Sequence, residues 1–239
     1  MHSISLKVDG LSKYFGKLCV INKISLKIYE GETFGLLGIN GAGKTTLIKC
    51  ILKLLNTAGG EILYKEKPLT LNDIYKRFGY LPENFLPPAE LTGGEFLRTL
   101  SLSLHIPYDN VISILKKVEL DSKKRIKNYS RGMIQRLGLA TALLKNPEFI
   151  ILDEPALGLD PVGQSKILTL LEGLNKQRKT IFFSSHNLIH IEKICSRIGI
   201  LHHGKIKFTG TVKGLLDEQN SNSLEQSFLK ILGCLKPSL

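Results

Sequence analysis

Eight residues in the first quarter of the chain, GINGAGKT from Gly38 to Thr45, have the types and spacing of a phosphate-binding P-loop. Glycines let successive backbone N–H groups approach phosphate oxygens, and a helix that begins at the loop adds the positive end of its dipole. Lys44 can neutralise the phosphates, and the hydroxyl of Thr45 suits Mg²⁺. The alternative is a glycine-rich turn without a ligand. The apolar strand pattern before the loop and the helical spacing after it favour the phosphate site.

A second group of reactive residues ends the apolar stretch FIIL, where Asp153 and Glu154 follow directly. A buried parallel strand presents such side chains at its carboxyl end, which is the edge of the sheet where ligands bind. We expect Asp153 to hold Mg²⁺ and Glu154 to act as a general base toward an attacking water molecule. Because Pro155 follows, a second interpretation is that the acid pair only forms a helix-capping turn.

Histidines follow the next apolar stretch, TIFFSS, and therefore reach the same edge of the sheet. His186 is expected to reach the terminal phosphate, although a lone histidine is more often an ordinary packed residue. His190, four residues on, could share a metal with His186 on one helix face, but no third ligand is in sight. His202 and His203 precede a hairpin turn at Gly204 and are expected on the surface.

A serine and a glycine in the stretch NYSRGMIQRL indicate a second anion site. Ser130 is expected to cap a helix that begins near Met133, and Gly132 would let a phosphate approach the backbone. The chain already holds its phosphates at the P-loop. The economical interpretation is that this second site serves a nucleotide bound by another copy of the chain.

Strands and helices alternate around these residues. The stretches ISLKVD and KISLKIY predict strands with one solvated face, TFGLLG predicts a central strand, and a helix is expected over roughly residues 44–54. From about 87 to 144 the pattern is helical, with a capping box at Thr92 and Glu95 and a second helix near 110–118. The strands EFIILDEP, TIFFSS, RIGILHH and KIKFTG follow with helices between them, and a capping box at Ser223 and Gln226 opens a last helix.

Composition narrows the class of partner. Lys and Arg number 33 against 21 Asp and Glu, a net charge of +12, so an anionic partner is plausible. The most basic run, residues 115–131, has no interleaved aromatics and is expected to be a solvated face. No apolar run approaches the roughly 20 residues of a membrane span. Four scattered cysteines and an N-terminus without signal-peptide character predict a cytoplasmic protein.

Together these motifs resemble the nucleotide-binding subunit of an ABC transporter over nearly the whole chain. GINGAGKT matches Walker A, FIILDE Walker B, ALGLD with Asp160 the D-loop, His186 the switch histidine, and YSRGM the signature. The resemblance implies an α/β P-loop NTPase fold of the ABC ATPase type, with a RecA-like core, an N-terminal antiparallel β subdomain and an inserted α-helical subdomain. The expected boundaries within one domain of residues 1–239 are a core at 1–86 and 145–220, a helical signature subdomain at 87–144, and a short C-terminal helix at 221–239.

The resemblance also implies contacts with ATP and Mg²⁺. Catalysis would rest on Lys44, Glu154 and His186. ATP would contact Asp160 and these P-loop residues: Gly38, Asn40, Gly41, Ala42, Gly43, Lys44, Thr45 and Thr46. Glu83, in GYLPE where the family commonly has Gln, would join Thr45 and Asp153 around Mg²⁺ and sense the membrane subunit.

Two further implied contacts lie away from the P-loop. Phe15 in KYFG would stack on adenine, with Tyr14 as the near alternative and a packed core aromatic as the ordinary interpretation. Ser130 and Gly132 would contact the γ-phosphate held by a partner's P-loop. The usual signature is LSGGQ, and here Tyr129, Arg131 and Met133 replace its Leu, first Gly and Gln, so Arg131 adds charge.

The resemblance implies an ATP-hydrolysing subunit that pairs with a second ABC ATPase subunit, most simply a copy of itself. The pair would drive a separate integral membrane permease from the inner face of the cell membrane. Export of a drug, lipid, polysaccharide or ion by the ABC-2 branch is favoured over import. A soluble ABC ATPase acting on nucleic acid or the ribosome is the other alternative, and no specific nucleic-acid partner is expected. A regulatory subunit without hydrolysis is disfavoured by Glu154 and His186.

Overall fold

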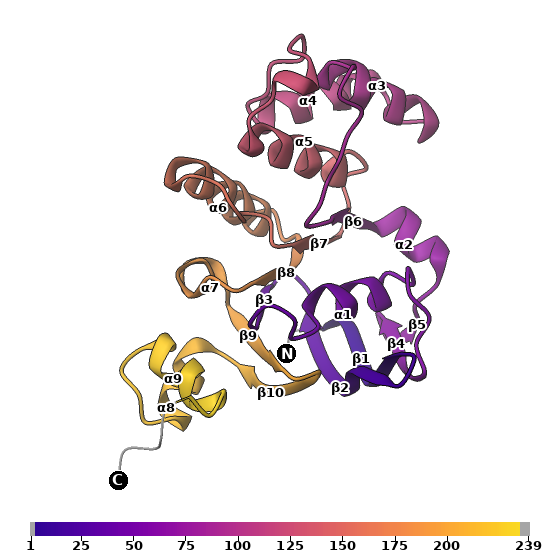
Figure 1. The fold of residues 1–239 in the computed structure, drawn as a ribbon. Coiled ribbons are helices and arrows are strands. Elements are labelled where there is room, and N and C mark those ends of the chain that lie inside the picture. Colours follow the sequence, from indigo (N-terminus) through magenta and orange to yellow (C-terminus); the bar gives the residue numbers. More distant parts are fainter. Residues whose placement is uncertain (1–2, 235–239) are drawn as a thin grey trace.

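The computed structural model describes residues 3–234, and within them the strands form two sheets (Figure 1). The first is antiparallel in the order β2-β1-β4-β5. Its strands are β1 (Ile4–Phe15), β2 (Leu18–Tyr29), β4 (Gly59–Tyr64) and β5 (Lys67–Pro68). Alternate residues of β2, including Ile24, Leu26 and Ile28, are buried, so one face packs on the core and the other meets solvent. The expected alternation of buried and solvent-facing residues along this strand is confirmed.

The second sheet carries the residues of chemical interest. Its order is β10-β9-β3-β8-β7-β6, all parallel except β10. The strands are β3 (Thr33–Leu37), β6 (Phe78–Leu81), β7 (Phe149–Asp153), β8 (Thr180–Ser185), β9 (Arg197–His202) and β10 (Lys205–Gly210). Every residue of β3, β7 and β8 is buried, which is why these strands read as continuous apolar runs. Their carboxyl ends meet at one edge, because Asp153 pairs with Ser184 and Leu37 with Ser185.

Helices connect these strands. They are α1 (Lys44–Ile51), α2 (Leu71–Arg77), α6 (Pro161–Lys176), α7 (Leu188–Ile194), α8 (Val212–Glu218) and α9 (Leu224–Ile231). The α1 helix ends before residue 54, where the periodicity had placed its end, because Lys53 adopts a left-handed backbone with φ of 54°. Leu54 is consequently exposed rather than part of the packed face. No helix within residues 3–234 is both long and apolar enough to span a bilayer.

Three helices make a separate group that we call the helical lobe, residues 93–143 (Figure 1). They are α3 (Gly93–Ser103), α4 (Tyr108–Lys117) and α5 (Arg131–Leu143), with a short 3₁₀ turn at Ile126–Asn128. The capping box of α3 is confirmed: Thr92 Oγ1 accepts from the Glu95 N–H at 3.1 Å, and Glu95 Oε2 accepts from the Thr92 N–H at 2.7 Å. The lobe joins the rest of the chain beside β6 and β7.

The last helix has half of its expected capping box. Ser223 Oγ accepts from the Gln226 N–H at 3.2 Å and so caps α9. The Gln226 side chain does not return to the Ser223 N–H, because it accepts from the Ser221 hydroxyl at 3.3 Å instead. Of the helix expected over 221–239, residues 235–239 lie outside the described part of the chain.

Candidate active site

The P-loop joins β3 to α1 and needs its glycines for two reasons. A Cβ on Gly38 would lie 2.6 Å from the Leu201 carbonyl oxygen, so no larger residue fits there. Gly43 has φ of 108°, which only glycine adopts at low cost. The α1 helix then begins at Lys44 without a side-chain cap and without an acid in its first turn. Its first N–H groups have no helical partner and carry the positive end of the dipole.

A cavity of about 280 Å³ brings together side chains that the sequence places far apart. Glu83 follows β6, Glu154 follows β7 and His186 follows β8, so three neighbouring strands of the sheet supply them. The sequence-predicted residues that line this cavity are Asn40, Gly41, Lys44, Thr45, Glu83, Glu154 and His186, and Leu157 completes the wall. The edge of the parallel sheet is therefore a candidate active site.

Glu154 is the centre of the charged groups in this cavity. Its side chain is only 7% exposed, and its Oε1 lies 3.2 Å from the Lys44 Nζ. Its Oε2 lies 3.0 Å from the His186 Nδ1. Lys44 also donates to the Gly38 carbonyl oxygen at 2.7 Å. Phosphate oxygens bound in the loop would compete with Glu154 for the ammonium group, which would free the carboxylate for other chemistry.

Ser184, at the carboxyl end of β8, positions both acids and was not singled out from the sequence. Its hydroxyl donates to Asp153 Oδ1 at 2.6 Å and accepts from the Glu154 N–H at 3.0 Å. The only hint was the pair of serines that ends TIFFSS. Their alignment with Asp153 depends on the register of β7 against β8, which is a tertiary property.

Asp153 provides the test of whether Mg²⁺ fits this site. The residue is fully buried, and its Oδ2 is a buried oxygen without a hydrogen-bond partner in the described part of the chain. Burial together with the charges of Asp153 and Glu83 raises the pKa of the nearby Tyr80 to about 12. Oxygen donors from Asp153, Thr45 and Glu83 are the kind that Mg²⁺ prefers, often through its water shell. The residues present therefore fit a magnesium ion.

The backbone at Glu154 is unusual. Its φ is 50°, a left-handed conformation that costs a non-glycine residue of order 1–3 kcal/mol. The interpretation of the acid pair as a helix-capping turn is wrong, because the residue that caps α6 is Asp160, whose Oδ1 accepts from the Gly163 N–H at 2.7 Å. The Asp153 side chain is bound to Ser184 and the Glu154 side chain faces the cavity.

Eight of the predicted nucleotide contacts are not among the residues that line this cavity. Four of them belong to the P-loop and the start of α1: Gly38, Ala42, Gly43 and Thr46. The other four lie on other segments of the chain: Phe15, Ser130, Gly132 and Asp160. Phe15 is 48% exposed at the end of β1, with the Lys13 ammonium 4.9 Å from its ring centroid, so it is not a core aromatic. Tyr14 is exposed to the same extent. Ser130 caps α5 as expected, because its hydroxyl accepts from the Met133 N–H at 3.3 Å.

Three further histidines, His190, His202 and His203, lie outside the cavity and contact other side chains of the fold. His190 is buried, its Nε2 lies 3.1 Å from Gln164 Oε1, and burial lowers its pKa. A metal shared with His186 has no support, because the two rings are engaged with different partners. His203 is exposed as expected, whereas His202, the last residue of β9, is half-buried and packs its ring 4.0 Å from that of His203.

This fold and site define an α/β protein with a P-loop, and comparison with known proteins identifies the family. The sequence profile of the ABC transporter family matches residues 21–157, more than half of the chain. The chain therefore belongs to the ABC transporter family. The α/β P-loop fold of the ABC ATPase type, with its antiparallel β part and its helical part, is confirmed.

Three curated relatives illustrate the range of the match. An uncharacterised ABC transporter ATP-binding protein of Nostoc sp. is 43% identical over 86% of this chain and 64% of its own length. The bacitracin transport ATP-binding protein BcrA of Enterococcus faecalis is 40% identical over 84% of this chain and 67% of its own length. The lantibiotic transport ATP-binding protein SrtF of Streptococcus pyogenes is 33% identical over 84% of this chain and 88% of its own length. The chain thus spans less than two thirds of the Nostoc protein.

Solved structures agree with this assignment. An ATP-binding subunit of an ABC transporter superposes with a TM-score of 0.84 at 28% identity, covering 95% of this chain and 98% of that one. A dimeric bacterial ABC transporter cassette superposes with a TM-score of 0.78 at 25% identity, covering 87% of this chain and 98% of that one.

Proposed function

We propose that this chain binds ATP with Mg²⁺, closes as a dimer around two ATP molecules and hydrolyses them to drive a separate membrane permease. The observation that carries the proposal is the cavity in which Glu154 lies between Lys44 and His186. A P-loop lysine, a buried carboxylate and a histidine at one sheet edge are the groups that phosphoryl transfer to water requires.

The chemistry divides among these side chains. The P-loop N–H groups and Lys44 bind the phosphates, which draws the ammonium group away from Glu154. Glu154 then accepts the proton of a water molecule whose oxygen attacks the γ-phosphorus. The bond from that phosphorus to the β–γ bridging oxygen breaks, and ADP and phosphate form. His186 holds the Glu154 carboxylate in position through Nδ1. Mg²⁺ held near Thr45, Asp153 and Glu83 would neutralise charge on the phosphates.

The second half of each site would come from a partner. Ser130 and Gly132 lie at the start of α5, outside the cavity formed by the P-loop of the same chain. A head-to-tail copy could place the Ser130 hydroxyl, the Gly132 backbone and the α5 dipole on the γ-phosphate. Phe15 and Asp160 would complete the nucleotide contacts. A dimeric state of a related cassette supports this arrangement.

Transport and location follow from the family and its named relatives. Relatives described as bacitracin and lantibiotic transport ATP-binding proteins favour export over import. We place the chain on the inner face of the cell membrane, with the core at residues 1–86 and 145–220 and the signature subdomain at 87–144. The segment that follows Glu83, in which Leu86 is 90% exposed, is the expected contact with the permease. A role on nucleic acid or the ribosome remains the alternative.

Copurification tests the transport part of this proposal. The tagged chain is solubilised from native membranes with detergent and purified, and the proteins that remain bound to it are identified by mass spectrometry. A stoichiometric protein with several membrane spans is the expected result. Recovery only with nucleic acid or ribosomes would refute the transport role, whereas ATP hydrolysis by the same sample would still support the site chemistry.

A further inference from the structure

A second cavity, of about 570 Å³, lies between the helical lobe and α6, apart from the P-loop site. Val118 and Arg136 line it from the lobe, while Val162, Ile167 and Leu170 line it from α6. Its size falls in the range of small-molecule pockets, roughly 300–1,000 Å³. None of the residues that line it takes part in the proposed ATP chemistry.

The walls of this cavity are mainly apolar along α6. Val118 and Ile167 are buried beneath it, and Val162 leaves 65% of its surface exposed at one end. The small residue Gly173 extends the groove along the same helix, where a Cβ would meet nothing within 4 Å. An apolar chain lying here would cover aliphatic surface that now faces water.

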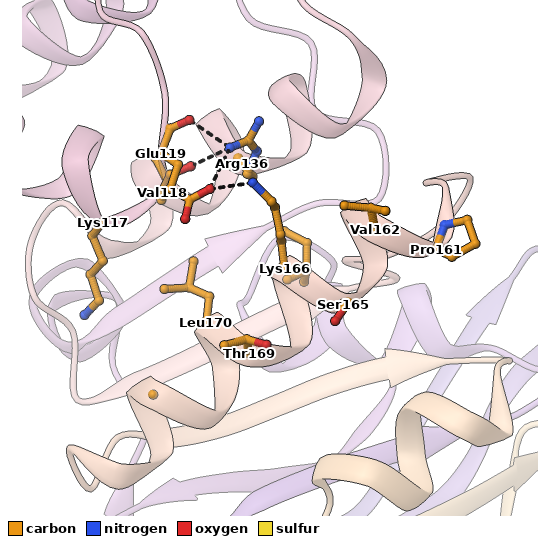
Figure 2. A pocket seen from close by; sticks show the side chains of 12 residues that line it. Lys117, Val118, Glu119, Arg136, Pro161, Val162, Ser165, Lys166, Thr169 and Leu170 are labelled. Atoms are coloured by element: carbon orange, nitrogen blue, oxygen red, sulfur yellow. Dashed lines mark hydrogen bonds and ion pairs between the residues drawn. The ribbon is translucent and has the colours of Figure 1, made fainter.

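The rim carries more positive than negative charge. Glu119 is the one acid among the residues that line the cavity, against three cations. Dashed lines in Figure 2 join Glu119 to both Lys166 and Arg136. The Lys166 ammonium lies 2.6 Å from the Glu119 carboxylate, and Arg136 also donates to the Val118 and Glu119 carbonyl oxygens. Glu119 is therefore already occupied by two of the cations.

Lys117 is the third cation and stands apart from that cluster in Figure 2. Within residues 3–234, the only hydrogen bond of its ammonium group is a long one of 3.4 Å to Gln177 Oε1, and no acid in that range pairs with it. Partial burial lowers the pKa of Lys117, and the pKa of Lys179 is lowered by burial first and by the positive charge of Lys117 second. This end of the cavity therefore has an uncompensated positive charge beside an apolar wall.

We propose that this cavity binds an amphipathic anion, an alkyl carboxylate of medium chain length. The alkyl chain lies along α6 against Ile167 and Leu170, and the carboxylate pairs with Lys117. A neutral alcohol of equal length would gain the apolar contact without the ion pair, and a short carboxylate would gain the ion pair without the contact. Both features are needed for tight binding.

The position of the cavity gives its occupant a route to the ATP site. Arg136 lies on α5, six residues after Ser130, and Val162 lies on α6, two residues after Asp160. A ligand that packs against both helices fixes the placement of the two segments that we propose as nucleotide contacts. This regulatory consequence rests on the proposed function, whereas binding itself does not.

Calorimetric titration of the nucleotide-free protein with decanoate, below its aggregation concentration, tests binding directly. We expect saturable binding at one site, tightening about fourfold for each methylene from hexanoate to decanoate. Decanol is expected to bind at least tenfold more weakly than decanoate. Absence of saturable heat, or equal affinity for decanol, would overturn the proposal.

Two substitutions and a neighbouring control locate the site. Lys117→Gln should weaken decanoate binding about tenfold, and Leu170→Asp should abolish it. Lys116→Gln is the matched control, because Lys116 is the preceding residue of α4 and does not line the cavity. Equal loss in Lys116→Gln and Lys117→Gln would refute the assignment of the carboxylate. The regulatory link is measured separately, by adding decanoate to an ATP hydrolysis assay. Decanoate should change the rate of the parent chain and leave the rate of Leu170→Asp unchanged.

Discussion

At the scale of single residues, Glu154 connects the groups that matter most. Its two carboxylate oxygens contact Lys44 and His186 while its backbone N–H binds Ser184. Loss of either partner would be costly, because removing one member of a buried ion pair leaves the other charge uncompensated. The left-handed backbone of Glu154 shows that the chain accepts strain to aim this carboxylate into the cavity.

Glu154→Gln should reduce the rate of ATP hydrolysis at least about 100-fold, because an amide cannot accept the proton of water. Nucleotide binding should persist, since the substitution leaves the P-loop N–H groups and Lys44 unchanged. Phosphate release and ATP-dependent sizing measure the two effects, and the variant is expected to accumulate as an ATP-bound dimer. Glu192→Gln, at an exposed position of α7, is the control. Hydrolysis at the parent rate would show that Glu154 is not the base.

Ser184→Ala should lower stability by about 1–3 kcal/mol, because it leaves Asp153 Oδ1 and the Glu154 N–H without a partner in a buried site. Turnover should fall more than ATP affinity, since both acids lose their positions. Denaturant unfolding and steady-state kinetics measure these effects. Ser227→Ala is a matched control, because Ser227 is equally buried but its hydroxyl has no hydrogen-bond partner among residues 3–234. A similar cost in both variants would show that the Ser184 bonds contribute nothing special.

At the scale of elements, the N-termini of the helices include two kinds: some are capped by a side chain, and that of α1 is left open to a ligand. The Asp160 side chain caps α6 and the Ser130 side chain caps α5, whereas α1 has no cap and leaves its first N–H groups to a ligand. The pair of acids at the end of β7 is free for chemistry because the cap of α6 comes six residues later. At Ser130 the capping role and the proposed ligand contact can therefore be distinguished by substitution.

Ser130→Ala and Ser130→Gly together separate these roles. Alanine should destabilise the protein by about 1 kcal/mol through the lost cap, whereas glycine should cost only a few tenths. Both should lower ATP hydrolysis strongly if the hydroxyl contacts a partner's nucleotide, while binding of ATP to the single chain stays near normal. Thermal unfolding, ATP titration and phosphate release give the three readouts. If activity follows stability across the pair, the serine is only a cap.

Glu148 joins three elements and gives the fold an acid sensitivity. Its carboxylate accepts from Lys65 at 2.8 Å, Arg77 at 2.7 Å and the Tyr64 hydroxyl at 3.1 Å. The hydrogen bond from Lys65 is the main cause that lowers its pKa. A carboxyl with a lowered pKa in the folded state stabilises the fold above its unfolded pKa, about 4.5, and this stability is lost as the pH falls further.

Glu148→Gln should therefore cost roughly 1 kcal/mol at pH 7, a value kept small because solvent screens this half-exposed network. The difference from the parent chain should shrink as the pH falls below about 4.5, because the carboxyl of the unfolded chain is protonated first and that of the folded chain only at lower pH. Urea unfolding at several pH values measures it, with Glu192→Gln as the control. A difference that stays constant down to pH 3 would contradict the ionic explanation.

At the scale of the whole molecule, the P-loop cavity is only half of the proposed site. Lys44, Glu154 and His186 meet at one edge of the parallel sheet, while Ser130 begins a helix of the lobe. In the proposed dimer, a second chain brings these halves together. The assembly, rather than the single chain, is the proposed catalytic unit.

Mixing two inactive variants tests this assembly. Glu154→Gln chains mixed with Ser130→Ala chains should recover about a quarter of the parent rate, because half of the dimers are mixed and each has one intact site. Each variant alone should stay inactive, and mixing each with itself is the control. No recovery after equilibration with ATP would indicate that Ser130 acts within its own chain.

The sequence by itself determined the order of strands and helices, the P-loop, the acid pair and the cap at Ser130. These depend on local properties: glycine spacing, apolar runs and side chains that bond within four residues. It also indicated that Glu154 and His186 reach one edge, because parallel strands present their carboxyl ends together. The end of α1 was missed because the apolar spacing continues past the left-handed turn at Lys53.

Only the tertiary structure decided which atoms meet. The bonds of Ser184 to Asp153 and Glu154 depend on the register of β7 against β8, and the Lys44 contact with Glu154 joins residues more than a hundred positions apart. The cavity beside Lys117 likewise exists only because the helical lobe packs against α6. Such contacts are set by packing between elements, and local sequence patterns carry no information about that packing.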